Sequence, residues 1–147
     1  MHVFRSMIID ASIDETWAAL RAFDGVVNWN PGVSEAVLES GQPTATSTIR
    51  CLSTPDGQVF RETLLAHSDA EHFYSYDILE SPLPVSDYVS THRLLPITST
   101  NQTLSIWESR FECRPQDVEE MERVVGDVIY IGGMSGLNAY LREQSNG

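Results

Sequence analysis

The side chains of this sequence that could do chemistry are acids, bases and hydroxyls rather than metal ligands or activated nucleophiles. The histidines and cysteines are scattered, without the spacing of a metal-binding motif. They are His2, His67, His72, His92, Cys51 and Cys113. No Ser-His-Asp arrangement, nucleophile elbow, phosphate-binding glycine loop or dinucleotide fingerprint is visible. We therefore expect no metal and no cofactor. The chemistry left open is that of one or two acid or base groups positioned in a shaped pocket.

The charge balance restricts the partners of the protein. The chain has 9 Lys and Arg against 21 Asp and Glu, a formal net charge of −12. Such a surface repels phosphate backbones and anionic lipid headgroups, so we expect no nucleic acid partner. No stretch approaches 18 consecutive apolar residues, and the first ten residues lack the pattern of a signal peptide. We expect a cytoplasmic protein without stable membrane insertion, either a monomer or a homodimer.

The length, 147 residues with 41% hydrophobic side chains, predicts a single domain spanning 1–147. A short apolar run at 3–10 predicts the first strand. An amphipathic helix follows from Ile13 to about Phe23, where Gly25 stops it. The break at Asn30-Pro31-Gly32 is compatible with a compact helical elbow before a second strand at 33–40.

The middle of the chain reads as a series of strands joined by short turns. The firmest local feature is the turn Pro55-Asp56-Gly57, where proline presets one backbone angle and glycine supplies a positive one. The two prolines of the segment 81–87 exclude it from a central strand. The expected strands are 47–53, 58–67, 72–80, 87–95 and 104–113. This order predicts a meandering antiparallel sheet.

A long final helix from 115 to about 141 is expected, because proline is absent after Pro115 and apolar residues recur at helical spacing. Interior glycines weaken this helix. They are Gly126, Gly132, Gly133 and Gly136. They indicate either a close approach of the helix to the sheet or room left for a ligand beneath it. The fold class is therefore α+β, with helices on one face of the sheet.

The order of these elements resembles the START/Bet v1-like (SRPBCC) superfamily over nearly the whole chain. The resemblance lies in the first strand, the helix IDASIDETWAAL, the WNPGV elbow, the meander and the long terminal helix. It implies a polyketide cyclase/dehydrase-like, helix-grip domain. In that fold a curved antiparallel sheet of about seven strands surrounds the C-terminal helix and leaves an internal cavity.

Five segments are similar to the plant lachrymatory-factor synthases and, more loosely, to the abscisic-acid receptors: STIRCLSTPDG, RETLLAHSD, HFYSYDI, SDYVSTH and IWESRFEC. In the synthase pattern, the residues that polarise a small substrate fall on Arg50, Glu62, Tyr76 and Tyr88. In the receptor pattern, the cavity positions fall on Glu62, Tyr88, Ser90 and Glu108. The loops at 54–57 and 80–85 take the place of the receptors' mobile loops. Because both depart from the receptor motifs, regulated loop closure is not expected.

Strand alternation extends this set, because residues two apart share a face of the sheet. If the residues named by the resemblance face a cavity, their alternate neighbours do so too, and together they describe a pocket with aliphatic and phenolic walls and a few carboxylates. With a residue of the final helix, the added ligand-binding candidates are Leu64, Ile78, Glu80, Ser90, His92, Ile106, Glu108 and Ser135.

Three functions remain open at this stage. The first is binding of a small hydrophobic molecule between the sheet and the final helix. The second is a cofactor-independent cyclase, dehydratase or isomerase, in which Glu62 acts as acid or base, Arg50 pairs with or orients it, and tyrosines hydrogen-bond the substrate. Arg50 and Glu62 could equally be a salt bridge that only fixes strand register. The third is a chaperone-like interaction module, which would need an exposed apolar groove rather than an enclosed pocket.

Overall fold

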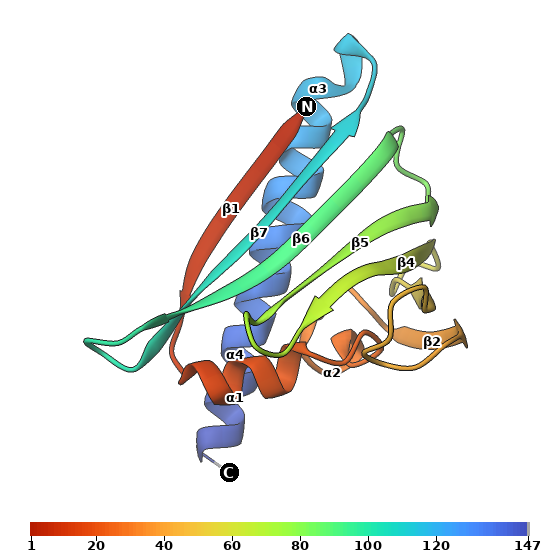
Figure 1. The fold of residues 1–147 in the computed structure, drawn as a ribbon. Helices are drawn as coiled ribbons and strands as arrows, with labels where there is room; N and C mark the ends of the chain where they lie inside the picture. Colours follow the sequence, from red (N-terminus) through yellow and green to blue (C-terminus); the bar gives the residue numbers. More distant parts are fainter. Residues whose placement is uncertain (147) are drawn as a thin grey trace.

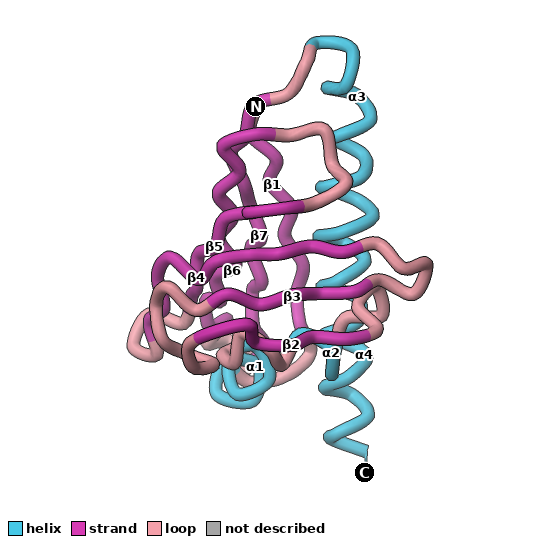
Figure 2. Tube along the Cα trace, turned by 90° about the vertical axis from the view of Figure 1, so that its right-hand side faces the viewer, coloured by secondary structure: helices cyan, strands magenta, loops and turns pink. Residues whose placement is uncertain are grey.

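The computed structural model, which describes residues 1–146, is built on one curved antiparallel sheet with the order β1-β7-β6-β5-β4-β3-β2. The strands are β1 (His2–Ile9), β2 (Glu35–Ser40), β3 (Ile49–Ser53), β4 (Val59–Ser68), β5 (Phe73–Glu80), β6 (Ser86–Ile97) and β7 (Gln102–Glu112). A long C-terminal helical segment runs along one side of the sheet (Figures 1 and 2). The α+β helix-grip fold expected from the sequence is confirmed.

The core lies between the sheet and the helices. Its fully buried side chains come from both ends of the chain as well as from the sheet, which ties the first strand to the last helix. Among them are Val3, Ile9, Leu20, Leu94, Met134 and Leu137.

The N-terminal helix α1 (Ile13–Leu20) begins where expected, with Ser12 as its N-cap, and buries Trp17 and Leu20. It ends three residues earlier than the pattern predicts. The amide of Phe23 donates to the carbonyl oxygen of Pro43 at 2.9 Å, so it is not available to continue the helix. The short helix α2 (Val26–Trp29) then forms the expected elbow.

The hairpin between β3 and β4 has the predicted turn at Pro55-Asp56-Gly57. Gly57 has a φ of +88°, a conformation that favours glycine. The Thr54 amide donates to the carbonyl oxygen of Gln58 at 2.9 Å and closes the turn. This places the Thr54 to Gln58 segment at the end of the sheet nearest the elbow.

The C-terminal segment is helical throughout, but its middle is not an α-helix. A 3₁₀ turn, η1 (Pro115–Asp117), leads into α3 (Val118–Met121), then a π-helical stretch, η2 (Glu122–Ile131), and finally α4 (Gly132–Asn146). The wider π turn changes which side chains are buried. The buried positions of this stretch are Val125, Gly126 and Tyr130, whereas Val128, which α-helical spacing would bury, is exposed. The expected α-helical spacing of the buried face is therefore wrong across this stretch.

The glycines of this segment divide between the two roles that the sequence left open. A Cβ on Gly136 would lie 2.4 Å from Cδ of Pro31 and 2.5 Å from the carbonyl oxygen of Trp29, and one on Gly133 would lie 2.8 Å from the Trp107 ring. Both positions require a close approach of neighbouring groups. A Cβ on Gly132 would meet no atom closer than 3.9 Å. A side chain at Gly132 would therefore make only an ordinary van der Waals contact, not a tight one.

We expect Gly136→Ala to destabilise the protein by about 1–3 kcal/mol, because the added methyl group overlaps backbone and proline atoms that cannot move aside easily. The matched control, Gly132→Ala, should be neutral or stabilising by up to about 1 kcal/mol, because alanine is the better helix former. Urea unfolding of both variants measures the difference. Equal stabilities would contradict the packing described here.

Candidate functional site

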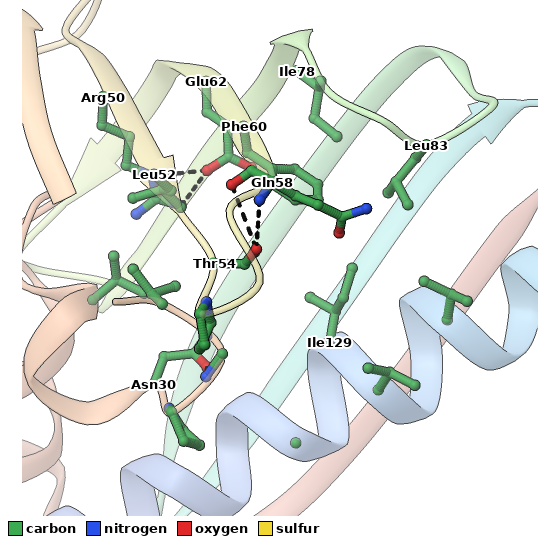
Figure 3. A pocket seen from close by; sticks show the side chains of 18 of the residues that line it. Asn30, Arg50, Leu52, Thr54, Gln58, Phe60, Glu62, Ile78, Leu83 and Ile129 are labelled. Atoms are coloured by element: carbon green, nitrogen blue, oxygen red, sulfur yellow. Dashed lines mark hydrogen bonds and ion pairs between the residues drawn. The ribbon is translucent and has the colours of Figure 1, made fainter. Parts of the chain in front are cut away.

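A pocket of about 390 Å³ lies between the sheet and the C-terminal helix. Its walls come from β3, β4, β5 and β6, the elbow after α2, the Thr54 to Gln58 turn, the loop at Leu83 and the helical stretch from Val124 to Gly132 (Figure 3). Most of the lining is apolar, including Val26, Val33, Leu52, Phe60, Leu83 and Ile129. Polar side chains lie on the sheet wall, on the elbow and on the turn. The sheet wall carries Arg50, Glu62, Tyr76 and Tyr88.

The central polar feature of that wall is a buried ion pair between Arg50 and Glu62. The two residues are direct partners on β3 and β4, so strand pairing alone brings their side chains together. Nε and Nη2 of Arg50 both lie 2.8 Å from Oε1 of Glu62. Nη1 of Arg50 donates to the carbonyl oxygen of Phe23 at 2.7 Å. The pairing that the sequence suggested is confirmed.

Aromatic rings enclose the guanidinium group of Arg50. Its Cζ atom lies 3.9 Å from the centroid of the Phe23 ring and 5.0 Å from that of Tyr76. Burial opposes the charge of Arg50, but the Glu62 carboxylate and the neighbouring tyrosines raise the pKa of the guanidinium above its ordinary value. Arg50 is therefore a permanent buried cation with one carboxylate as its partner.

Glu62 keeps one oxygen free. Glu62 lines the pocket, and both of its contacts with Arg50 use Oε1. No hydrogen bond within residues 1–146 uses Oε2. Burial raises the pKa of the Glu62 carboxyl group above its usual value, and the nearby guanidinium opposes this shift. A raised pKa makes the carboxylate a better proton acceptor than a carboxylate in water.

A buried hydrogen-bond network lies beside the ion pair. Its members are the hydroxyl groups of Tyr76, Tyr88, Ser90 and Tyr130 and the indole of Trp107. Ser90 Oγ donates to the carbonyl oxygen of Glu108 at 3.1 Å, so its 2.9 Å hydrogen bond with Tyr130 uses the tyrosine proton. The short hydrogen bond between Tyr130 and Tyr88 then uses the proton of Tyr88. Tyr88, which lines the pocket, therefore offers its oxygen as an acceptor.

Tyr76 offers the pocket a hydrogen-bond donor, whereas Tyr88 offers an acceptor. Nε1 of Trp107 donates to Oγ of Ser90 at 3.0 Å and shares the same hydrogen with the hydroxyl oxygen of Tyr76 at 3.2 Å. The proton of Tyr76 itself enters no hydrogen bond within residues 1–146. Burial raises the pKa of Tyr76 well above its ordinary value, so the hydroxyl keeps this proton. Tyr76 is thus a free hydrogen-bond donor in the pocket wall.

Two aromatic side chains of this network, Trp107 and Tyr130, form a stack of three rings with His92. His92 stacks on Trp107 with ring centroids 4.4 Å apart, and Trp107 stacks on Tyr130 at 4.6 Å. His92 Nε2 lies 2.7 Å from Oγ of Ser105, while Nδ1 is buried without a partner. Burial and the charge of Arg50 lower the pKa of His92 to about 3. His92 is therefore a neutral member of the core rather than a proton carrier near pH 7.

Of the twelve candidate residues from the sequence, five line the pocket: Arg50, Glu62, Tyr76, Ile78 and Tyr88. Three others face the interior but do not line it. Leu64 and His92 are packed in the core, and Ser90 belongs to the hydroxyl network behind the wall.

The prediction that the even-numbered residues of β7 face the interior was wrong. Glu108 lies on the outer side of the sheet, where its carboxylate is 2.8 Å from His2, and Ile106 shares that side. The inward positions are instead odd-numbered, because Trp107 pairs with His92 and Ser109 pairs with Ser90. The bulky indole occupies the core, and this determines the face of the whole strand.

Glu80 and Ser135 also lie away from the pocket. The pairing of β5 with β4 shifts between Ile78 and Glu80, so Glu80 pairs with the outward residue Arg61, and their side chains are 3.4 Å apart. Such a bulge reverses the alternation that the sequence argument assumed. Ser135 is exposed on α4.

Sequence reasoning missed Tyr130 as a member of the site and treated Trp107 only as a packing residue. Tyr130 is fully buried and holds the hydroxyl group of Tyr88. The tyrosine in this helical stretch was the available signal, but the expected α-helical spacing placed the buried face on Val128 and Ile131, whereas the π-helical spacing buries Tyr130.

Within residues 1–146, no helix is long and apolar enough to cross a membrane. The same residues contain no group of three or more His, Cys, Asp or Glu side chains that could hold a metal ion.

The curved sheet, the long terminal helix and the pocket between them define a helix-grip domain of the START/Bet v1-like superfamily. The family described as polyketide cyclase/dehydrase and lipid transport matches residues 1–142, and the chain belongs to this family. No curated protein matches this chain.

Solved structures agree with this classification. An uncharacterised protein from Bacillus thuringiensis is 29% identical, with a TM-score of 0.87 over 97% of this chain and 99% of its own. The protein XoxI from Bacillus cereus is 28% identical, also with a TM-score of 0.87, over 98% of this chain and 97% of its own. A norcoclaurine synthase point mutant from Thalictrum flavum, in complex with a transition state analogue, shares the fold at 14% identity. Its TM-score is 0.76, over 99% of this chain and 96% of its own.

The neutral, buried state of His92 predicts a loss of stability in acid. Between pH 6.5 and about 3 the unfolded chain binds a proton at His92 that the folded protein does not, so the free energy of unfolding falls as the pH falls. In this window we expect His92→Gln to show a pH slope shallower than the wild type by up to about 1.4 kcal/mol per pH unit. Urea unfolding at several pH values measures both slopes. Identical slopes would contradict a neutral His92.

Proposed function

We propose that this protein binds a small, largely apolar ligand in the pocket between the sheet and the C-terminal helix. The observation that carries the proposal is the composition of the pocket wall. Apolar side chains surround one buried ion pair, in which Glu62 retains an oxygen without a hydrogen-bond partner. A mainly apolar pocket with a few convergent polar groups is the usual form of a small-molecule site.

The size of the pocket and the family support this proposal. A volume of about 390 Å³ falls within the range of small-molecule sites, near its lower end. The family is described as polyketide cyclase/dehydrase and lipid transport, which favours a hydrophobic ligand. Gly132 lines the pocket and contributes no side chain to fill it.

Filling the pocket from Gly132 should weaken binding. Because Gly132 lines the pocket, Gly132→Phe should reduce affinity for the neutral fluorescent probe N-phenyl-1-naphthylamine about tenfold or more. The matched control Gly132→Ala should bind almost as well as the wild type. Fluorescence titration provides the affinities. Unchanged binding by Gly132→Phe, or no binding by the wild type, would contradict the proposal.

A second candidate function is catalysis without a cofactor, favoured by the free oxygen of Glu62. A carboxylate with a raised pKa can take a proton from a C–H or O–H group of the ligand and return it to another atom. Such a transfer is an isomerisation when the proton returns to a different carbon, and a dehydration when it leaves with a hydroxyl group as water. Arg50 positions Glu62, and Tyr76 can hydrogen-bond an oxygen that gains negative charge.

This second function predicts hydrogen exchange at an enolisable ligand. NMR in D₂O, run on a panel of apolar ketones, should reveal protein-catalysed exchange beside the carbonyl group. Glu62→Gln should lower its rate about 100-fold or more. The control Glu80→Gln alters an exposed carboxylate outside the pocket and should have no effect. Absence of catalysed exchange across the panel, or an unchanged rate in Glu62→Gln, would reject this role.

A further inference from the structure

We propose that the pocket selects an uncharged ligand bearing a hydroxyl group, either an alcohol or a phenol, and rejects carboxylates. This inference rests on the proposed binding function and specifies the chemical class of its ligand. It follows from which hydrogen-bonding groups of the pocket wall are already used and which remain free.

The free acceptor is Oε2 of Glu62. Arg50 is a permanent cation, and a buried guanidinium without a counter-ion is very costly, so Glu62 is held as the carboxylate. Its second oxygen then requires a donor from the ligand. A ligand hydroxyl group supplies one, and hydrogen bonds to a charged acceptor are stronger than those between neutral groups.

The free donor is the hydroxyl group of Tyr76. Tyr76 lies on β5 at the position paired with Leu64, two residues along β4 from Glu62, so both side chains are on the pocket side of the sheet. A hydroxyl group is the smallest group that donates to Glu62 and accepts from Tyr76 through one oxygen atom. An aliphatic or aromatic body then contacts the apolar wall.

The pocket offers no free cationic group to an anion. The guanidinium of Arg50 contacts Glu62 and the Phe23 carbonyl oxygen, and its face is covered by the Phe23 ring. Among the residues lining the pocket, Arg50 is the only Lys or Arg, whereas Glu62 and Asp56 both carry carboxylates. A ligand carboxylate would therefore lose its hydration and meet a like charge.

Competition by three indoles of nearly equal size tests this selection. Each displaces N-phenyl-1-naphthylamine from the wild-type protein at pH 7: tryptophol carries a hydroxyl group, 3-ethylindole carries none, and indole-3-acetate carries a carboxylate. We expect tryptophol to compete about tenfold better than 3-ethylindole, and indole-3-acetate to be the weakest of the three. A tryptophol affinity no better than that of 3-ethylindole, or a preference for indole-3-acetate, would overturn the inference.

The same experiment separates this inference from the proposed function. If neither N-phenyl-1-naphthylamine nor any indole binds, the pocket is not a ligand site and both statements fail. If the fluorescent probe binds but the expected order of the indoles is not found, the binding function stands and the hydroxyl selection is wrong.

Glu62→Gln should change the order of the indoles. Without the carboxylate, the advantage of tryptophol over 3-ethylindole should shrink, and indole-3-acetate should gain affinity because Arg50 has lost its counter-ion. Affinity ratios of the three indoles equal to those of the wild type would contradict the assignment. Should circular dichroism show that this variant does not fold, Tyr76→Phe provides a second test. It removes the hydroxyl group, while Nε1 of Trp107 keeps its 3.0 Å hydrogen bond to Oγ of Ser90, and it should weaken tryptophol about fivefold without affecting 3-ethylindole.

Discussion

The buried ion pair of Arg50 and Glu62 is the constraint on which the pocket depends. A guanidinium group that is 2% exposed must find its hydrogen bonds inside the protein. It finds them on β4, through Glu62, and on the segment after α1, through the carbonyl oxygen of Phe23. The pair therefore joins the sheet to the elbow at the place where the pocket begins. Because both contacts with Glu62 use one oxygen, the same pair provides structural support and an unpaired acceptor.

The C-terminal helical segment forms the opposite wall of the pocket, and its π-helical middle determines which side chains face the sheet. The π-helical stretch brings Tyr130 into contact with Trp107 and with the hydroxyl groups of Tyr88 and Ser90. Tight contacts at Gly133 and Gly136 hold the following helix against Trp107 and the elbow, whereas Gly132 makes none. Close packing at Gly133 and Gly136, beside a position at Gly132 without a tight contact, leaves the pocket at a defined place.

Local patterns in the sequence were sufficient to predict the fold, whereas the residues of the candidate site came from the family resemblance. Alternation, the Pro-Asp-Gly turn and the proline-free terminal segment predicted the order of strands and helices, and the family resemblance identified Arg50, Glu62, Tyr76 and Tyr88. The remaining errors came from tertiary features. On β7 each face contains residues that could line an interior, and the packing of Trp107 against His92 determines which face is buried. A bulge near Glu80 and the π turn before Tyr130 change the spacing at which side chains return to the same face. A prediction that assumes regular strand or helix spacing therefore fails at these two places.

The most direct test of the account is the location of a bound ligand on the isoleucine side chains. Ile78 and Ile129 line the pocket, whereas Ile8 is exposed and Ile106 lies on the outer side of the sheet. In a methyl NMR titration with N-phenyl-1-naphthylamine, the account predicts large shifts for Ile78 and Ile129 and little change for Ile8 and Ile106. Shifts concentrated on Ile8 and Ile106, or no shifts at saturating probe, would contradict a ligand site between the sheet and the C-terminal helix.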